Sequence, residues 1–153
     1  MKRSSGILPY KVEDGKLLVY LERPGGPFWE GKNKWSICKG EHKIGESCID
    51  AAVREFSEES GFLLDKEKMF YIGSSKQASR KLITVFGIET DLDVTKMTSN
   101  TFKREFPKGS GIINEYPEMA EAKWFTIDEA LEVIFDGQIY ILNKLANMID
   151  NLL

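Results

Sequence analysis

The sequence predicts a single α/β domain, with helices covering a mixed β-sheet. Its length of 153 residues is enough for one ordinary hydrophobic core and too short for two typical domains. The content of 42% hydrophobic and 29% charged residues is typical of a soluble globular protein. Short apolar or β-branched segments alternate with segments of helical periodicity, and no repeat or linker separates them. We therefore expect residues 1–153 to form one domain.

The first part of the chain is predicted to form strands joined by turns. Glu13-Asp14-Gly15 contains the Asp-Gly pair that favours a hairpin turn. The segment RPGGPFWEGKNKW is rich in glycine and proline and should be a loop. A short strand then leads through Lys39-Gly40 into a turn over 41–46. The strands expected in this part are 5–10, 17–21 and 35–38.

Three helices are predicted from their capping residues and apolar faces. The first begins after Ser47, a suitable N-cap residue, and ends at Gly61. Thr126 and Glu129 form a capping box that starts the second helix. The third carries apolar residues at helical spacing. The second and third helices should cover 127–135 and 138–151, with strands over 69–73, 82–88 and 123–125 and an irregular polar segment over 91–116.

Glu55, Glu58 and Glu59 crowd one side of the first predicted helix, within an arc of roughly 100°. Like charges this close repel one another by roughly a few tenths of a kcal/mol per pair. A hard divalent cation removes that repulsion, because Mg²⁺ and Mn²⁺ prefer carboxylate oxygens. The spacing alone also allows a solvated acidic face. A Ca²⁺ site of the EF-hand type is disfavoured, because its ligands lie in a flexible loop rather than on a helix.

The wider pattern around this helix resembles a known family. Residues 40–62 read GEHKIGESCIDAAVREFSEESGF and fit G-x5-E-x7-R-E-U-x-E-E-x-G-U, where U is a bulky apolar residue. This is the signature of the Nudix hydrolases, which the chain resembles at every fixed position. The segments WSICKG and WFTIDEA also resemble the usual Nudix frame. Two departures are Cys38, where many relatives have proline, and Phe56, which is larger than the usual aliphatic residue.

The resemblance implies an α/β/α sandwich that hydrolyses a diphosphate linkage in a nucleoside diphosphate joined to a further group. It implies that Glu55, Glu58 and Glu59, with the carbonyl of Gly40, ligate Mg²⁺, or alternatively Mn²⁺. Glu55 and Glu58 are then also catalytic residues. Arg54 is expected to hold a glutamate of the motif in place through a charge-assisted pair.

The remaining candidates are a general base and residues that contact the substrate. Glu121 resembles the loop acid that serves some relatives as general base, and we favour it over Glu118. Glu46 is grouped with the substrate-binding residues, where it supports Arg54 or the metal. The other candidates for contact with substrate are Lys39 and Arg80 for phosphates and Trp35, Phe28 and Trp29 for stacking on a base. For each aromatic residue, packing in the core or loop is the alternative.

The charge and the apolar content of the sequence limit the kinds of partner that the protein can bind. The net charge of −3 and pI near 5.3 argue against binding to a nucleic-acid backbone, and hence against RNA decapping. No apolar run has the length of a membrane span or signal peptide, so we expect a cytoplasmic protein. The expected substrate is a nucleoside triphosphate or a dinucleoside polyphosphate. The alternatives are a catalytically inactive nucleotide-binding module and, for assembly, a homodimer.

Overall fold

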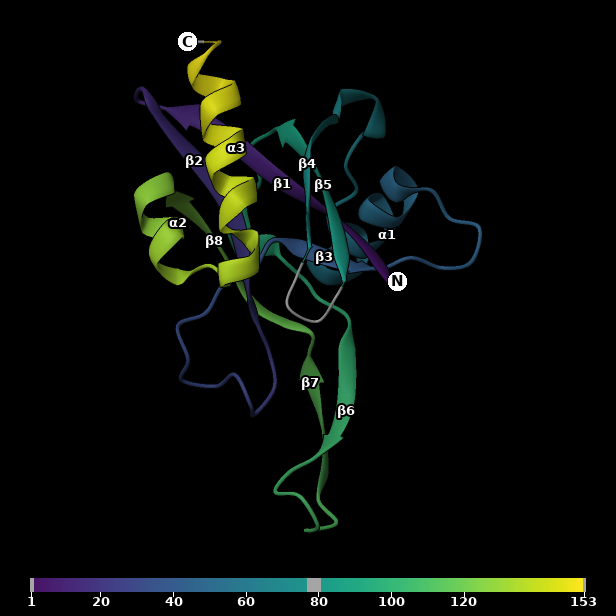
Figure 1. The fold of residues 1–153 in the computed structure, drawn as a ribbon. Helices are drawn as coiled ribbons and strands as arrows, with labels where there is room; N and C mark the ends of the chain where they lie inside the picture. Colours follow the sequence, from purple (N-terminus) through teal and green to yellow (C-terminus); the bar gives the residue numbers. More distant parts are fainter. Residues whose placement is uncertain (1, 77–80, 153) are drawn as a thin grey trace.

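The centre of the computed structural model, which describes residues 2–76 and 81–152, is a mixed sheet of six strands (Figure 1). The strand order is β4-β5-β1-β2-β8, and β3 pairs with β1. β1 runs parallel to β5, whereas the other pairs are antiparallel. The strands are β1 (Arg3–Glu13), β2 (Lys16–Pro24), β3 (Cys38–Glu41), β4 (Phe70–Lys76), β5 (Leu82–Glu89) and β8 (Met119–Thr126).

β1 is long enough to pair with two strands along the same edge. Its first half, from Ser4 to Ile7, pairs with β3, and its second half, from Tyr10 to Glu13, pairs with β2. The turn from β1 to β2 has positive φ at Asp14 (52°) and Gly15 (77°), as a type I′ hairpin turn requires. The predicted hairpin is therefore confirmed.

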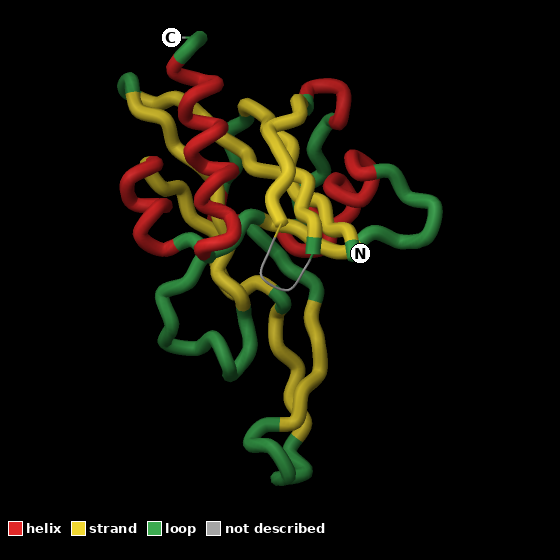
Figure 2. The backbone as a smooth tube through the Cα atoms, in the orientation of Figure 1, coloured by secondary structure: helices red, strands yellow, loops and turns green. Residues whose placement is uncertain are grey.

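Helices cover both faces of the sheet, which confirms the predicted α/β/α sandwich. α1 (Cys48–Ser60) packs on one face, and α2 (Ile127–Val133) and α3 (Ile139–Asp150) pack on the other (Figures 1 and 2). Because successive strand residues point to opposite faces, the buried Ile7 joins the cluster under α1 and its neighbour Leu8 joins the cluster under α3. Among the described residues, none of the helices has both the length and the apolar character needed to cross a bilayer.

The helix ends follow the capping residues. The Ser47 side chain accepts a hydrogen bond from the backbone of Asp50, and Gly61 ends α1 with a φ of 79°. The capping box of Thr126 and Glu129 is formed at the start of α2. α2 ends two residues earlier than predicted, and a short 3₁₀ turn over 136–138 separates it from α3.

Two predictions about strands are wrong. Trp35 and Ser36 form only isolated bridges, and the regular strand begins at Cys38 and continues through Gly40. The segment 91–116, predicted to be irregular, contains a hairpin of β6 (Thr101–Glu105) and β7 (Ile113–Pro117) that projects away from the sandwich (Figures 1 and 2). Most residues of this hairpin are exposed on both faces, so the apolar alternation that indicates a half-buried strand is weak there.

Candidate active site

Arg54 ties the loop before α1 to the glutamates of the helix. Its Nε and Nη2 donate to the two carboxylate oxygens of Glu46, at 2.8 and 2.9 Å. Its Nη1 donates to Glu55 Oε1 at 2.7 Å and to Glu58 Oε2 at 3.2 Å, and Nη2 also donates to the carbonyl of Glu41 at 2.9 Å. A planar guanidinium presents several donors in a fixed geometry. One side chain therefore sets the positions of three carboxylates.

Glu46 serves Arg54 in this structure. The hydrogen bonds from Arg54, helped by the backbone of Lys43, lower the pKa of Glu46 to about 2, so this carboxylate is ionised throughout the neutral range. Both of its oxygens are occupied by these donors. Of the two supporting roles predicted for Glu46, the contacts favour support of Arg54.

The three helix glutamates share one feature that suits a metal. One oxygen of each accepts a hydrogen bond, from Arg54 for Glu55 and Glu58 and from Cys38 Sγ (3.2 Å) for Glu59. Within residues 2–76 and 81–152, the second oxygen of each has no protein donor. A carboxylate held by one oxygen keeps the other for a hard cation, and Mg²⁺ prefers such ligands. The donor set therefore fits a divalent ion.

Gly40 provides the space that Glu55 needs. A Cβ atom built on Gly40 would overlap the carboxylate of Glu55, so only glycine lets the strand lie against this side chain. The role of the Gly40 carbonyl as a metal ligand stays a prediction. In the part of the chain that the structure describes, no three acidic, histidine or cysteine side chains are close enough to form a ready-made metal cage.

Burial raises the pKa values of two glutamates between α1 and the sheet. Burial, together with the charges of Glu55 and Glu118, raises the pKa of Glu59 to about 7. Glu22, on β2, is completely buried, and burial followed by the charge of Glu59 raises its pKa to about 9. We did not predict a role for Glu22. The sequence feature that could have identified Glu22 is its position two residues after Tyr20, which puts both side chains on the α1-facing side of a largely apolar strand.

Lys39, which is predicted to contact a phosphate oxygen, experiences the charge of Glu59. Its side chain is partly buried, and burial followed by the charge of Lys81 lowers its pKa, while the charge of Glu59 acts in the opposite direction. Lys81 itself pairs with Glu41 at 3.0 Å. Two basic residues therefore lie at β3, the strand whose Gly40 packs against Glu55 of α1.

The structure brings Glu118, rather than Glu121, toward the helix glutamates. On β8, Ala122 faces the α1 cluster and Phe125 faces the opposite cluster. The alternation of strand side chains puts Glu121 on the side away from α1, where it accepts from Arg23 Nε at 3.3 Å and is 52% exposed. Burial and the charge of Glu55 raise the pKa of Glu118. The assignment of Glu121 as general base stays a prediction that this placement does not favour.

Trp35, a further candidate, is not found at the site. Trp35 is only 4% exposed and packs edge-to-face on Phe125, with a centroid distance of 4.9 Å. Its indole N–H donates to Asn33 Oδ1 at 2.9 Å. Trp35 is therefore a core residue whose ring faces are not accessible to a base, and packing is the alternative that holds. Arg80 lies outside the described residues.

The α/β/α sandwich with its glutamate-rich helix is the fold of the Nudix hydrolases, which are pyrophosphohydrolases. The chain belongs to the Nudix family, because the model of the NUDIX domain matches residues 2–143. The prediction of the family is thus confirmed. Members of this family generally depend on a divalent metal. The comparison with curated protein sequences finds no significant match.

Solved structures share the fold at low sequence identity. An Ap4A hydrolase from C. elegans, in a binary complex, has a TM-score of 0.67 and 17% identity, with 99% of each chain covered. The NUDIX domain of Shewanella oneidensis NrtR, complexed with ADP ribose, has a TM-score of 0.68 and 11% identity, covering 96% of this chain and 87% of the other. A MutT/nudix family protein from Enterococcus faecalis has a TM-score of 0.59 and 16% identity, covering 82% of this chain and only 43% of the other. At these identities the comparison establishes the fold alone.

Proposed function

We propose that the protein hydrolyses a phosphoric anhydride bond of a nucleoside polyphosphate, either a nucleoside triphosphate or a dinucleoside polyphosphate. We further propose that Glu55, Glu58, Glu59 and the carbonyl of Gly40 hold Mg²⁺, with Mn²⁺ as a substitute. The observation that carries the proposal is that each of these glutamates is fixed through one oxygen and free of protein donors on the other within the described chain.

Each nearby side chain has a task in this scheme. Arg54 and Glu46 hold the glutamates in position. Lys39 donates to an oxygen of the diphosphate. Glu118 accepts a proton from the attacking water, because its raised pKa makes it a better base than an ordinary carboxylate. When bound, the divalent ion neutralises charge that develops on the phosphate oxygens and makes a coordinated water more acidic.

Support for this role of Glu118 comes from its surroundings. It is partly buried and senses the charge of Glu55, whereas Glu121 is exposed and paired with Arg23. Glu118→Gln should therefore lower kcat by roughly a hundredfold or more. Glu121→Gln should have a small effect; the reverse result would restore Glu121 as the base.

The first test is a hydrolysis panel with and without Mg²⁺. It contains nucleoside triphosphates, dinucleoside polyphosphates, ADP-ribose, nucleotide sugars and capped RNA, with products separated by chromatography. We expect metal-dependent cleavage of a nucleoside polyphosphate. If folded protein cleaves none of these compounds, the proposed reaction is wrong and the nucleotide-binding module becomes the better description.

Variants of the helix glutamates provide the second test. Glu58→Gln and Glu59→Gln should each reduce turnover by orders of magnitude while the circular dichroism spectrum is unchanged. Both should also weaken Mn²⁺ binding, which electron paramagnetic resonance measures without any turnover. Glu67→Gln is the matched control, because Glu67 is an exposed residue of the 3₁₀ turn Lys66–Lys68 outside the site. Equal activity of wild type and either site variant would contradict the metal assignment.

A further inference from the structure

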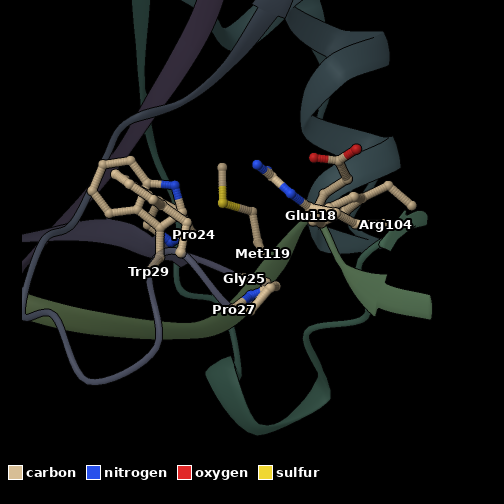
Figure 3. Close-up of a pocket in the computed structure, with 10 residues that line it drawn as sticks. Pro24, Gly25, Pro27, Trp29, Arg104, Glu118 and Met119 are labelled. Atoms are coloured by element: carbon tan, nitrogen blue, oxygen red, sulfur yellow. The ribbon is translucent and has the colours of Figure 1, made fainter. Parts of the chain in front are cut away.

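A pocket of about 300 Å³ lies between the loop 24–29 and the β6–β7 hairpin (Figure 3). The loop supplies Trp29, the hairpin supplies Phe102 and Arg104, and Glu118 and Met119 complete the lining. The volume is at the lower end of the range for small-molecule sites. It is therefore suited to one ring system rather than to a whole dinucleotide.

Two consecutive glycines let the loop lie directly against the hairpin. A Cβ atom on Gly25 would overlap the carbonyl oxygen of Pro117, and one on Gly26 would come within 2.8 Å of the Phe102 ring. Gly26 also has a φ of 92°, which side-chain-bearing residues rarely adopt. The close contact of loop and hairpin thus depends on this Gly-Gly pair, and the pocket is a built feature of the fold.

Backbone hydrogen bonds fix the pocket relative to the acidic helix. The N–H of Asn100 donates to the carbonyl of Glu58 at 2.8 Å, and the N–H of Glu118 donates to the carbonyl of Asn100 at 2.8 Å. The N–H of Gly25 then donates to the carbonyl of Glu118 at 2.9 Å. Three bonds therefore connect α1, the base of the hairpin and the loop in series. The pocket therefore has a fixed position relative to the helix glutamates.

The walls of the pocket are aromatic and held in place. Trp29 packs edge-to-face against Phe28 at 4.8 Å and against Phe135 at 5.2 Å between centroids. Trp29 and Met119 project into the same space in Figure 3. An indole ring fixed by its neighbours and a polarizable thioether provide surfaces on which a planar ring can stack.

Arg104 brings an unpaired positive charge to the same pocket. Its side chain extends between Glu118 and Met119 in Figure 3. Of the carboxylates that the structure describes, none lies within 4.0 Å of the Arg104 guanidinium nitrogens. A guanidinium has five N–H donors and no acceptor. It therefore suits a ligand edge that carries acceptors.

We propose that this pocket binds the nucleobase of the substrate, with the base stacked against Trp29 and an acceptor-bearing edge bound by Arg104. This assignment rests on the proposed function, because the polyphosphate of the same ligand is then bound at Glu55, Glu58 and Glu59. Of the three predicted stacking residues, Phe28, Trp29 and Trp35, it selects Trp29. It also gives the hairpin, which lies outside the sandwich, a role in choosing the substrate.

The test measures binding without turnover. Calorimetric titrations with a non-hydrolysable nucleoside triphosphate analogue, in Mg²⁺, compare wild type with Arg104→Gln and Trp29→Leu. Each variant should bind the analogue at least about tenfold more weakly, from lost charge-assisted hydrogen bonds or lost stacking. Lys103→Gln is the matched control, since Lys103 precedes Arg104 on β6 and points to the other face of the hairpin. Its affinity should change less than twofold.

Inorganic tripolyphosphate separates base recognition from phosphate recognition. Because it has no base, it should bind wild type, Arg104→Gln and Trp29→Leu equally well. A similar loss for tripolyphosphate and for the analogue in Arg104→Gln would overturn the proposal, since Arg104 would then be a phosphate ligand. Wild-type affinity of both variants for the analogue would overturn it as well.

The outcome can be told apart from failure of the proposed function. If the wild type hydrolyses nothing but the two variants still lose affinity for the analogue, the pocket assignment stands and the reaction does not. If hydrolysis occurs and the variants bind normally, the reaction stands and the pocket assignment fails.

Should hydrolysis be found, Arg104→Gln should raise KM more than it lowers kcat, because a base contact made equally in ground and transition states affects binding rather than chemistry. Thermal unfolding of each variant checks that it retains the fold, which matters most for Trp29→Leu.

Discussion

Replacing Glu22 with glutamine should stabilise the protein in a strongly pH-dependent way. Glu22 is completely buried in β2, where one oxygen accepts from the Tyr20 hydroxyl at 3.2 Å. The other oxygen is buried with no hydrogen-bond partner among the described residues. Burial, followed by the charge of Glu59, raises the pKa of Glu22 from its ordinary value of 4.5 to about 9. The folded protein therefore holds this carboxyl protonated at neutral pH.

The sign and size of the effect follow from proton linkage. Between pH 4.5 and 9 the folded state binds a proton at Glu22 that the unfolded state has lost, so stability falls as pH rises through this window. One pKa unit corresponds to about 1.4 kcal/mol. Proton uptake therefore opposes folding by about 3 kcal/mol at pH 7 and by less than about 1 kcal/mol at pH 5. Glutamine has the shape of the protonated side chain and needs no proton.

The measurement is urea unfolding of wild type and Glu22→Gln at pH 5 and pH 7, with EDTA present so that no cation alters the charges nearby. We expect the variant to be more stable by about 3 kcal/mol at pH 7, or roughly 6–12 °C in Tm, and nearly equal to wild type at pH 5. Glu67→Gln, at an exposed position, should show no such pH dependence. A stability difference that is the same at both pH values would refute the reasoning, because it would mean that Glu22 is not protonated on folding.

Three other substitutions test separate parts of the structure. Gly40→Ala places a methyl group on the Glu55 carboxylate and should reduce activity more than tenfold with little change in the far-ultraviolet circular dichroism; unchanged kcat would contradict the steric role of Gly40. Arg54→Lys loses the two-point contact with Glu46 and should lower kcat by about 10–100-fold in steady-state assays, and a lysine variant with full activity would show that the fork geometry is unimportant. Thr126→Ala removes the N-cap of α2 and should cost about 1 kcal/mol in urea unfolding without changing kcat.

The sandwich was predictable because its elements carry strong local signals. Strand 82–88 is apolar and β-branched, and α3 repeats its apolar residues at helical spacing, so both were found with small errors at their ends. The β6–β7 hairpin was not predictable in this way. Its strands bury little, and the connection from 106 to 112 is longer than the two-residue turn that signals a hairpin. Its position is instead fixed by contacts distant in sequence, such as Phe102 against Gly26.

The same distinction explains which candidate site residues could be identified from the sequence. Arg54, Glu55, Glu58 and Glu59 share one helix, so their spacing alone determines that they are neighbours. Glu118 comes from a different part of the chain, and its approach to Glu55 depends on where β7 ends and β8 begins. A choice between acids three residues apart needs the strand register, since alternate side chains face opposite sides of a sheet. Sequence spacing does not supply that register.

The charges at this end of α1 explain why so many acids can be tolerated together. Arg54 supplies one positive charge to Glu46, Glu55 and Glu58 at once. These four side chains together therefore keep a net negative charge. Glu59 lowers the remaining repulsion by having a pKa of about 7, which leaves it ionised only part of the time at neutral pH. A divalent cation beside Glu59 favours its ionised form and should lower that pKa. Cation binding should therefore release protons near pH 7, and calorimetry in buffers of different ionisation enthalpy measures this release; no proton release would show that Glu59 is already ionised or does not contact the ion.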